Sequence, residues 1–341
     1  MKQHSDGRCP ACGAQVSRVD NFCEKCGREL SSAAVSTGAA PASHRCDCGS
    51  AEIAADGYCE RCGQKAPSGR DHVEIDLGAL AGVTDRGRRH LRNEDAMGLA
   101  LTETPTGTAA LAVVCDGVST SARPEEASLA AAEAALPVLT ERLRAGITAA
   151  EALTTAVLAA DAAVRDLAGQ SFDAPAATIV SGVVTADEIA VHWIGDSRAY
   201  WLPEDPGLDA ERLTRDDSLA AELIEAGALS EADAQSSPHA HVVTRWLGAD
   251  AETREPHAVS LQPPGPGLLL LCTDGLWNYQ PEASGLARLA RPRSPGDLAG
   301  ATADLLAVAL EAGGQDNVTI VLIAFPPRGN DAPALQRSMP R

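Results

Sequence analysis

The sequence predicts an α+β fold, in which a β-sandwich of two antiparallel sheets is flanked by helices and preceded by two small cysteine-rich modules. Eight of the ten cysteines fall before residue 63, so the chain divides into a cysteine-rich segment and a large remainder. In the remainder, strand-like and helix-like segments occur in runs rather than in alternation, as is typical of antiparallel sheets with helices outside. The 341 residues, 45% of them hydrophobic, suffice for one large domain plus smaller modules.

The cysteine-rich segment contains an internal repeat. CGAQVSRVDNFCEKCGREL and CGSAEIAADGYCERCGQKA align cysteine on cysteine when one is shifted onto the other. Two Cys-x-x-Cys-Gly knuckles bring four thiolates around one tetrahedral ion, and four thiolates leave no open position for catalysis. Each copy therefore predicts a structural zinc ribbon, with two Zn²⁺ in all. The expected zinc ligands are Cys9, Cys12, Cys23, Cys26, Cys46, Cys48, Cys59 and Cys62.

The second ribbon departs from the first, because one residue rather than two separates Cys46 from Cys48. His44 could therefore take the place of Cys46. Small flexible residues around the ribbons predict linkers. The expected boundaries are 1–30 for ribbon 1, 31–43 for a linker, 44–66 for ribbon 2, 67–74 for a linker, 75–327 for the large domain and 328–341 for a disordered tail.

The charge of the chain restricts its partners. The formal net charge is −19, and residues 71–341 hold 19 basic against 39 acidic side chains. This balance argues against nucleic acid as a partner, because phosphate backbones are bound by clustered basic side chains. No apolar run suits a signal peptide or a membrane span, so we expect a cytoplasmic protein with reduced thiols and no membrane contact.

The elements of the large domain follow from hydrophobic patterning. The alternation or continuity of apolar residues predicts strands in 73–85, 95–103, 108–117, 177–202, 267–275 and 317–325. Helical spacing predicts two Ala/Leu-rich helices near 124–145 and 148–169, a charged helical region at 217–235, and two short helices between 281 and 312.

Four aspartates lie at or beside the ends of these strands: Asp95, Asp116, Asp274 and Asp316. Strand ends of a sandwich meet at one rim, where converging carboxylates would repel one another unless cations held them together. Oxygen ligands without nearby His or Cys favour Mg²⁺ or Mn²⁺. Two such ions can activate a water for attack on phosphorus, so the pattern predicts hydrolysis of a phosphate ester.

The motifs NED, VVCDG, IGDSRAY, LLLLCTDGL and GGQDN occur in an order that resembles the metal-dependent protein phosphatase family (PPM, or type 2C) from about Val83 to Phe325. The resemblance implies a serine/threonine phosphatase with a PPM-type sandwich and a two-metal site. It implies that Asp95 and Asp316 are terminal ligands, that Asp116 bridges the ions, and that Asp274 and the Gly117 carbonyl complete the set. Glu94 would hold water bound to the ions, and Asp196 is a candidate ligand for a third ion or else a turn carboxylate paired with Arg198.

Three departures from the family pattern bear on activity. His90 stands where the family usually has a phosphate-binding arginine, so His90 or Arg92 would bind the phosphate, and His90 could protonate the leaving group. Residues 118–121 carry Ser119 and Thr120 where bacterial members have glycines. Asp217 stands where a histidine is common.

The expected function is therefore a Mn²⁺- or Mg²⁺-dependent phosphatase acting on phosphoproteins made by a serine/threonine kinase, with ribbons that recruit a protein partner. The alternative is a catalytically weak or inactive phosphatase-fold scaffold or regulatory adaptor. A zinc-ribbon nucleic-acid factor is a third reading, which the near-neutral ribbons and the acidic body disfavour.

Overall fold

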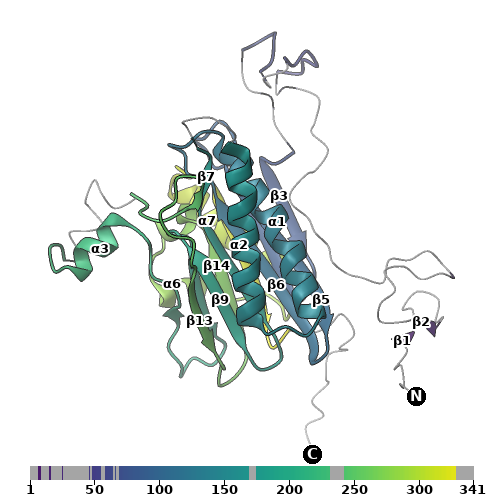
Figure 1. The fold of residues 1–341 in the computed structure, drawn as a ribbon. Coiled ribbons are helices and arrows are strands. Elements are labelled where there is room, and N and C mark those ends of the chain that lie inside the picture. Colours follow the sequence, from purple (N-terminus) through teal and green to yellow (C-terminus); the bar gives the residue numbers. More distant parts are fainter. Residues whose placement is uncertain are drawn as a thin grey trace, which may run out of the picture.

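Two antiparallel sheets lie face to face in the large domain of the computed structural model (Figure 1). The structure describes residues 7–8, 15–16, 25, 46, 48–54, 58–63, 66, 69–168, 174–230 and 242–327. The first-ribbon ligands Cys9, Cys12, Cys23 and Cys26, the alternative ligand His44, and the predicted segments 31–43 and 328–341 lie outside these residues. Two short strands, β1 (Gly7–Arg8) and β2 (Gln15–Val16), pair antiparallel in the N-terminal segment.

The first sheet has five strands in the order β13-β9-β8-β6-β5. Its strands are β5 (Asp95–Thr104), β6 (Gly107–Asp116), β8 (Ile179–Val184), β9 (Ile189–Ile194) and β13 (His257–Leu261). Two further strands, β7 (Ala176–Ala177) and β12 (Leu247–Gly248), precede β8 and β13 in the sequence and form a separate antiparallel pair. The interior strands are buried on both faces, which explains why β6 is a nearly continuous apolar run.

The second sheet has six strands in the order β11-β10-β14-β15-β4-β3. Its strands are β3 (His72–Asp76), β4 (Leu80–Asp85), β10 (Arg198–Pro203), β11 (Glu211–Arg212), β14 (Gly267–Cys272) and β15 (Val318–Phe325). The core between the two sheets includes Met97, Val114, Val180, Leu269 and Val321.

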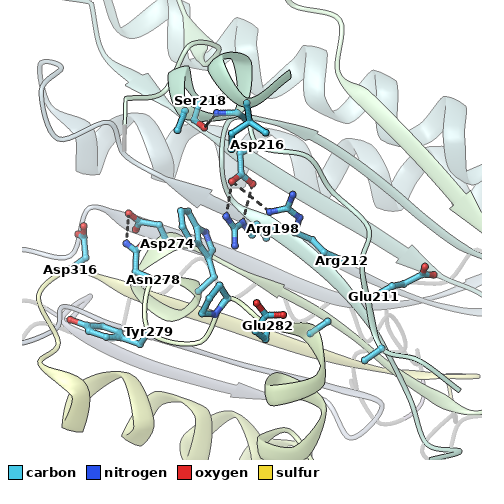
Figure 2. Close-up of a pocket in the computed structure, with 18 of the residues that line it drawn as sticks. Arg198, Glu211, Arg212, Asp216, Ser218, Asp274, Asn278, Tyr279, Glu282 and Asp316 are labelled. Carbon is cyan, nitrogen blue, oxygen red and sulfur yellow. Dashed lines mark hydrogen bonds and ion pairs between the residues drawn. The ribbon is translucent and has the colours of Figure 1, made fainter. Parts of the chain in front are cut away.

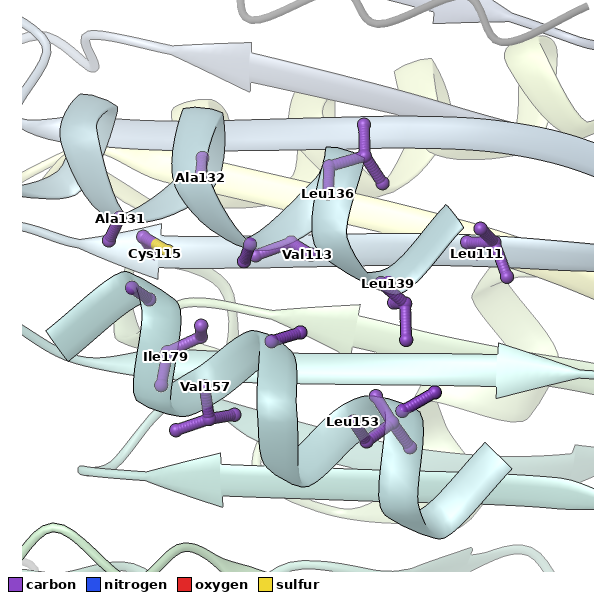
Figure 3. Packing of buried hydrophobic residues seen from close by; sticks show 14 of the residues in the cluster. Leu111, Val113, Cys115, Ala131, Ala132, Leu136, Leu139, Leu153, Val157 and Ile179 are labelled. Carbon is purple, nitrogen blue, oxygen red and sulfur yellow. The ribbon is translucent and has the colours of Figure 1, made fainter. Parts of the chain in front are cut away.

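Helices cover the outer face of each sheet. The five-stranded sheet is covered by α1 (Pro124–Arg144) and α2 (Ala149–Ala168), whose alanines and leucines pack on β6 and β8 (Figure 3). The six-stranded sheet is covered by α5 (Asp274–Trp277), α6 (Ala283–Leu289) and α7 (Leu298–Ala312). A further short helix, α3 (Leu219–Glu225), follows β11. The predicted sandwich with outer helices is therefore confirmed.

Three expected boundaries differ from the structure. The helix predicted at 217–235 is described only as α3, and α7 is 15 residues long rather than short. β3 begins at His72, inside the segment predicted to be a linker. The side chain of Arg70 also donates hydrogen bonds to the carbonyl oxygens of Asp95 (3.0 Å) and Glu125 (2.8 Å), so Arg70 contacts the sandwich although it lies in the segment expected to be a linker.

Candidate metal centre

The strand-end aspartates come from both sheets. Asp95 begins β5 and Asp116 ends β6, and the antiparallel register places the two residues directly opposite each other. Asp274 follows β14 as the first residue of α5, and Asp316 precedes β15, the strand paired with β14. Each sheet therefore supplies two of the four predicted ligands.

The charges of these carboxylates act on one another. Burial raises the pKa of Asp116 well above its usual range, and the nearby charges of Asp95, Asp274, Asp196 and Asp316 raise it further. Burial likewise raises the pKa of Asp274 well above its usual range, with further contributions from Asp316 and Asp196. A buried group of like charges is unfavourable in the ionised form, unless cations compensate for it.

The hydrogen bonds of Asp95 leave one oxygen unpaired. Oδ2 accepts hydrogen bonds from Thr319 Oγ1 (2.7 Å) and Thr273 Oγ1 (3.0 Å). Oδ1 is buried and has no hydrogen-bond partner among the described residues. Burial is the main reason that the pKa of Asp95 rises to about 7. An unsatisfied buried acceptor lowers the stability of the folded state by about 1–3 kcal/mol. A hard cation such as Mg²⁺ could bind this oxygen, because such ions prefer carboxylate ligands.

Gly117 lies where a larger residue could not. A Cβ at this position would lie 2.4 Å from the Pro124 carbonyl oxygen and 2.8 Å from that of Glu94. The Gly117 amide donates to the same Glu94 oxygen at 3.1 Å. The segment after Asp116 can therefore pass between Glu94 and the start of α1, which keeps the Gly117 backbone beside the carboxylate group.

Glu94 is held by residues of two other segments. Its side-chain Oε2 accepts a 2.6 Å hydrogen bond from Ser119 Oγ. Its amide donates to Asn317 Oδ1 at 2.7 Å. Ser119 belongs to the loop that departs from the family pattern, so the replacement of a glycine here gives Glu94 a hydroxyl partner.

The two phosphate-binding candidates differ in position. His90 Nε2 lies 3.1 Å from Oδ1 of Asp316, and the His90 side chain is 26% exposed. The guanidinium of Arg92 forms an ion pair with Glu125. His90 is therefore the candidate that the structure places against an expected metal ligand, whereas Arg92 already has an anionic partner.

Asp196 is buried, and its charge acts on Asp116 and Asp274. The pKa of Asp196 is raised to about 7, mainly by burial and also by the charge of Asp216, while the guanidinium of Arg198 acts in the opposite direction. Arg198 does not form the ion pair with Asp196 that we expected if Asp196 were a turn carboxylate. It forms a two-point ion pair with Asp216 (2.9 and 2.7 Å), with its Cζ 3.6 Å from the centre of the Trp277 ring.

Asp217 joins three segments behind the turn that carries Asp196. Its Oδ2 accepts a 2.9 Å hydrogen bond from the amide of Gly195, which has a φ of +108°. Its Oδ1 lies 2.8 Å from Nε2 of His257 and 3.5 Å from the guanidinium of Arg245. Asp217 therefore holds the Gly195 turn against His257 and Arg245, at the position where a histidine is common in the family.

A cavity of about 990 Å³ opens beside the aspartates (Figure 2). Asp274 and Asp316 lie at one side of the cavity, and Glu211 and Arg212 lie toward the other. Apolar residues of α3 and the start of α6 complete the wall, including Ala221, Ile224 and Ala283. The cavity has room for a peptide next to the carboxylate group.

The four cysteines of the second ribbon converge. The sulfurs of Cys46, Cys48, Cys59 and Cys62 all lie within 4.8 Å of one another. The Cys46–Cys62 and Cys48–Cys59 sulfur distances are 3.5 and 3.6 Å, close to the edge of about 3.8 Å for a tetrahedron with Zn–S bonds near 2.3 Å. The single-residue spacing of Cys46 and Cys48 is therefore compatible with a four-thiolate site.

Several supporting residues were not identified from the sequence. They are Thr273, Thr319, Asp216 and Asn317. The sequence singled out Ser119 as a departure from the family loop, but not as a partner of Glu94. Asn317 is the last residue of the GGQDN motif, so the sequence could have indicated that it lies at the site. Among the described helices, none combines the length and apolarity needed to cross a membrane.

Comparison with known proteins agrees with this geometry. Residues 84–295 match the family model described as protein phosphatase 2C, and residues 8–30 match that of a zinc-ribbon domain. The serine/threonine phosphatase stp of Listeria innocua is 32% identical over 147 residues, which cover 43% of this chain and 55% of that protein. The chain thus spans about half the length of the curated relatives it matches.

Solved structures extend the likeness over most of the large domain. The phosphatase MsPP of Mycobacterium smegmatis, solved in complex with cacodylate, is 28% identical with a TM-score of 0.56, over 72% of this chain and 97% of that one. The catalytic domain of PstP, solved with two manganese ions, shares the fold with a TM-score of 0.57 at 24% identity, over 72% and 97% of the two chains. Because the family model covers more than half of the sequence and includes Asp95, Asp116 and Asp274, this chain belongs to the protein phosphatase 2C family.

Proposed function

We propose that the chain is a protein serine/threonine phosphatase that hydrolyses phosphoserine and phosphothreonine in proteins phosphorylated by a serine/threonine kinase. The observation that carries this proposal is the buried group of aspartates from both sheets, in which Oδ1 of Asp95 has no partner among the described residues. The Listeria relative named as a serine/threonine phosphatase supports it.

Asp95, Asp116, Asp274, Asp316 and the Gly117 carbonyl would hold two Mn²⁺ or Mg²⁺ ions. The two manganese ions of the PstP catalytic domain support this number. When bound, such ions supply an activated water and balance the charge of the phosphoryl oxygens. Asp196 would be a ligand of a third ion, because it is buried and its charge acts on both Asp116 and Asp274.

The remaining residues orient the site and move the proton. Thr273 and Thr319 fix the Asp95 carboxylate by hydrogen bonds to one oxygen, which leaves the other free for an ion. Glu94, fixed by Ser119, would orient the attacking water. His90 would bind the substrate phosphate and donate a proton to the leaving oxygen of the serine or threonine side chain, which becomes a hydroxyl.

Release of phosphate from a chromogenic phosphomonoester tests the assignment. The purified protein with Mn²⁺ should release phosphate, and Asp274→Asn should stop the release. Asp166→Asn, which makes the same chemical change at an exposed position of α2, serves as the control and should keep the rate. Equal rates in the wild type and Asp274→Asn would contradict the proposal, and tight phosphopeptide binding without turnover would support the scaffold alternative.

We further propose that residues 1–30 and 44–66 form two zinc ribbons, joined by linkers, that recruit a protein partner in the cytoplasm. The described thiols of the second ribbon support one of the two zinc ions. Zinc content should be near two ions per chain, and Cys59→Ser should remove about one. Deletion of residues 1–66, which retains Arg70, should keep turnover of a small substrate and weaken capture of the partner. Loss of that turnover would contradict the division.

A further inference from the structure

The loop between β4 and β5 is strongly basic. Its sequence RGRRHLR, residues 86–92, contains four arginines and a histidine and no acidic residue. The whole chain has a net charge of −19, so this concentration of positive charge is unusual for the molecule. Core packing does not account for it, because Arg88 and Arg89 are exposed.

Two of the four arginines have anionic partners. Arg92 forms an ion pair with Glu125, and Arg86 lies 3.9 Å from Asp71. Arg88 and Arg89 form no ion pair or side-chain hydrogen bond with any residue in the described part of the chain. Two guanidinium groups are therefore available to a ligand.

The loop backbone is fixed against the segment that carries Asp316. Gly87 has a φ of +71°, and a Cβ there would lie 2.1 Å from the Asp316 carbonyl oxygen. The amide of Arg88 donates to the Gly314 carbonyl oxygen at 2.7 Å, and the side-chain amide of Asn317 donates to the Arg86 carbonyl oxygen at 2.8 Å. The positions of Arg88 and Arg89 relative to the metal centre are thus set by the fold.

The loop also borders the reaction site. Nε2 of His90 lies 3.1 Å from Asp316 Oδ1, and Arg88 and Arg89 precede His90 directly. Consecutive Cα atoms are about 3.8 Å apart, so both arginines begin within about 8 Å of the His90 Cα. An extended peptide advances about 3.3 Å per residue, so side chains one to three positions from a bound phosphoresidue would reach them.

We propose that Arg88 and Arg89 bind carboxylate side chains of the substrate that flank the phosphorylated residue, and thereby select acidic phosphopeptides. The inference rests on the proposed phosphatase function and names the substrate class for that site. Guanidinium groups match carboxylates in geometry and charge. A nucleic acid is a poor occupant, because the surrounding domain carries 39 acidic against 19 basic residues.

Matched phosphoserine peptides test the proposal on the full-length protein with Mn²⁺. The peptides are identical except for aspartate, alanine or lysine at the positions around the phosphoserine, and kcat/KM is measured for each. Wild type should prefer the aspartate peptide over the alanine peptide by about three- to tenfold, the size expected for two partly exposed ion pairs, and the preference should fall at high salt.

The double variant Arg88→Gln, Arg89→Gln should bring the aspartate-to-alanine ratio close to one. Arg142→Gln is the control for the same chemical change, because Arg142 is exposed near the end of α1, about 27 Å along the helix from its start. This variant removes one positive charge and should keep the wild-type ratio. Arg88→Lys with Arg89→Lys should retain part of the preference.

A wild-type ratio near one, or an unchanged ratio in the double glutamine variant, would overturn the inference. Preference for a second phosphoserine with none for aspartate would overturn the assignment to carboxylates. If the wild type releases phosphate neither from a chromogenic phosphomonoester nor from any peptide, the proposed function fails instead, so the two failures are distinguishable.

Discussion

Ser119 Oγ donates a 2.6 Å hydrogen bond to Oε2 of Glu94, across 25 residues of sequence. The bond joins the loop after β6 to the segment just before β5. The bond therefore holds the Glu94 carboxylate in place. This matters for turnover, because Glu94 is expected to orient water at the metal centre.

Removal of this hydroxyl should impair turnover. Ser119→Ala is expected to lower kcat by about three- to tenfold, the effect of losing one hydrogen bond to a charged group that is partly exposed. Ser119→Thr keeps a hydroxyl and should restore most of the rate. Steady-state kinetics on a phosphomonoester provide the measurement, and a kcat for Ser119→Ala equal to that of wild type would show that Glu94 needs no such support.

His90 should reveal its role through the leaving group. If it donates a proton, His90→Ala will lower kcat more for phenyl phosphate than for p-nitrophenyl phosphate, because phenoxide is the poorer leaving group and gains more from protonation. A uniform decrease for both substrates would argue for phosphate binding alone. His90→Arg should bind inorganic phosphate more tightly by about tenfold, since a guanidinium binds phosphate at two points.

The raised pKa values give the metal-free protein a specific pH dependence. Asp95 and Asp196 have pKa values of about 7 in the folded state, raised first by burial, whereas unfolded aspartates titrate near 3.9. The folded state therefore binds more protons between about pH 4 and 7, so the free energy of unfolding is largest below this window and decreases as pH rises through it. Mn²⁺ should reverse this loss at pH 7.5, because it replaces the protons.

Tryptophan fluorescence during urea unfolding measures this effect in the large domain alone. All four tryptophans lie there: Trp193, Trp201, Trp246 and Trp277. The decrease from pH 5 to pH 7.5 without Mn²⁺ should be smaller in Asp95→Asn, which cannot titrate. An identical decrease in this variant would exclude Asp95 as a source.

Asp217 should contribute mainly to stability. Asp217→Ala leaves the Gly195 amide and the Arg245 guanidinium without this acceptor, so the free energy of unfolding should fall by about 2–4 kcal/mol. Asp209→Ala, at an exposed position, should change it by less than about 0.5 kcal/mol. Urea midpoints of the two variants decide the comparison, and equal midpoints would contradict the supporting role.

The sequence predicted the sandwich and the gathering of aspartates because both depend on local patterns. Apolar runs such as that of β14 predict buried strands, and an aspartate after such a run predicts a charge at the sheet edge. The contacts of Arg70 with Asp95 and Glu125 were not predicted, because they join distant segments and leave no local signal.

The supporting residues escaped prediction for a similar reason. Thr273 and Thr319 lie 46 residues apart, and both donate to Asp95 far upstream. Arg198 lies two residues from Asp196 in the sequence, yet it pairs with Asp216, which is 18 residues away. Threonines and arginines at such positions look the same whether they bind a ligand residue or face solvent, so only the folded chain distinguishes them.

The origin of the aspartates in two sheets has a mechanical consequence. A dication shared between β5–β6 and the segments next to β14 and β15 would cross-link the two halves of the sandwich along one seam. Withdrawal of the ions should loosen both halves there together, so amide hydrogen exchange at the two sets of strand ends should accelerate in concert.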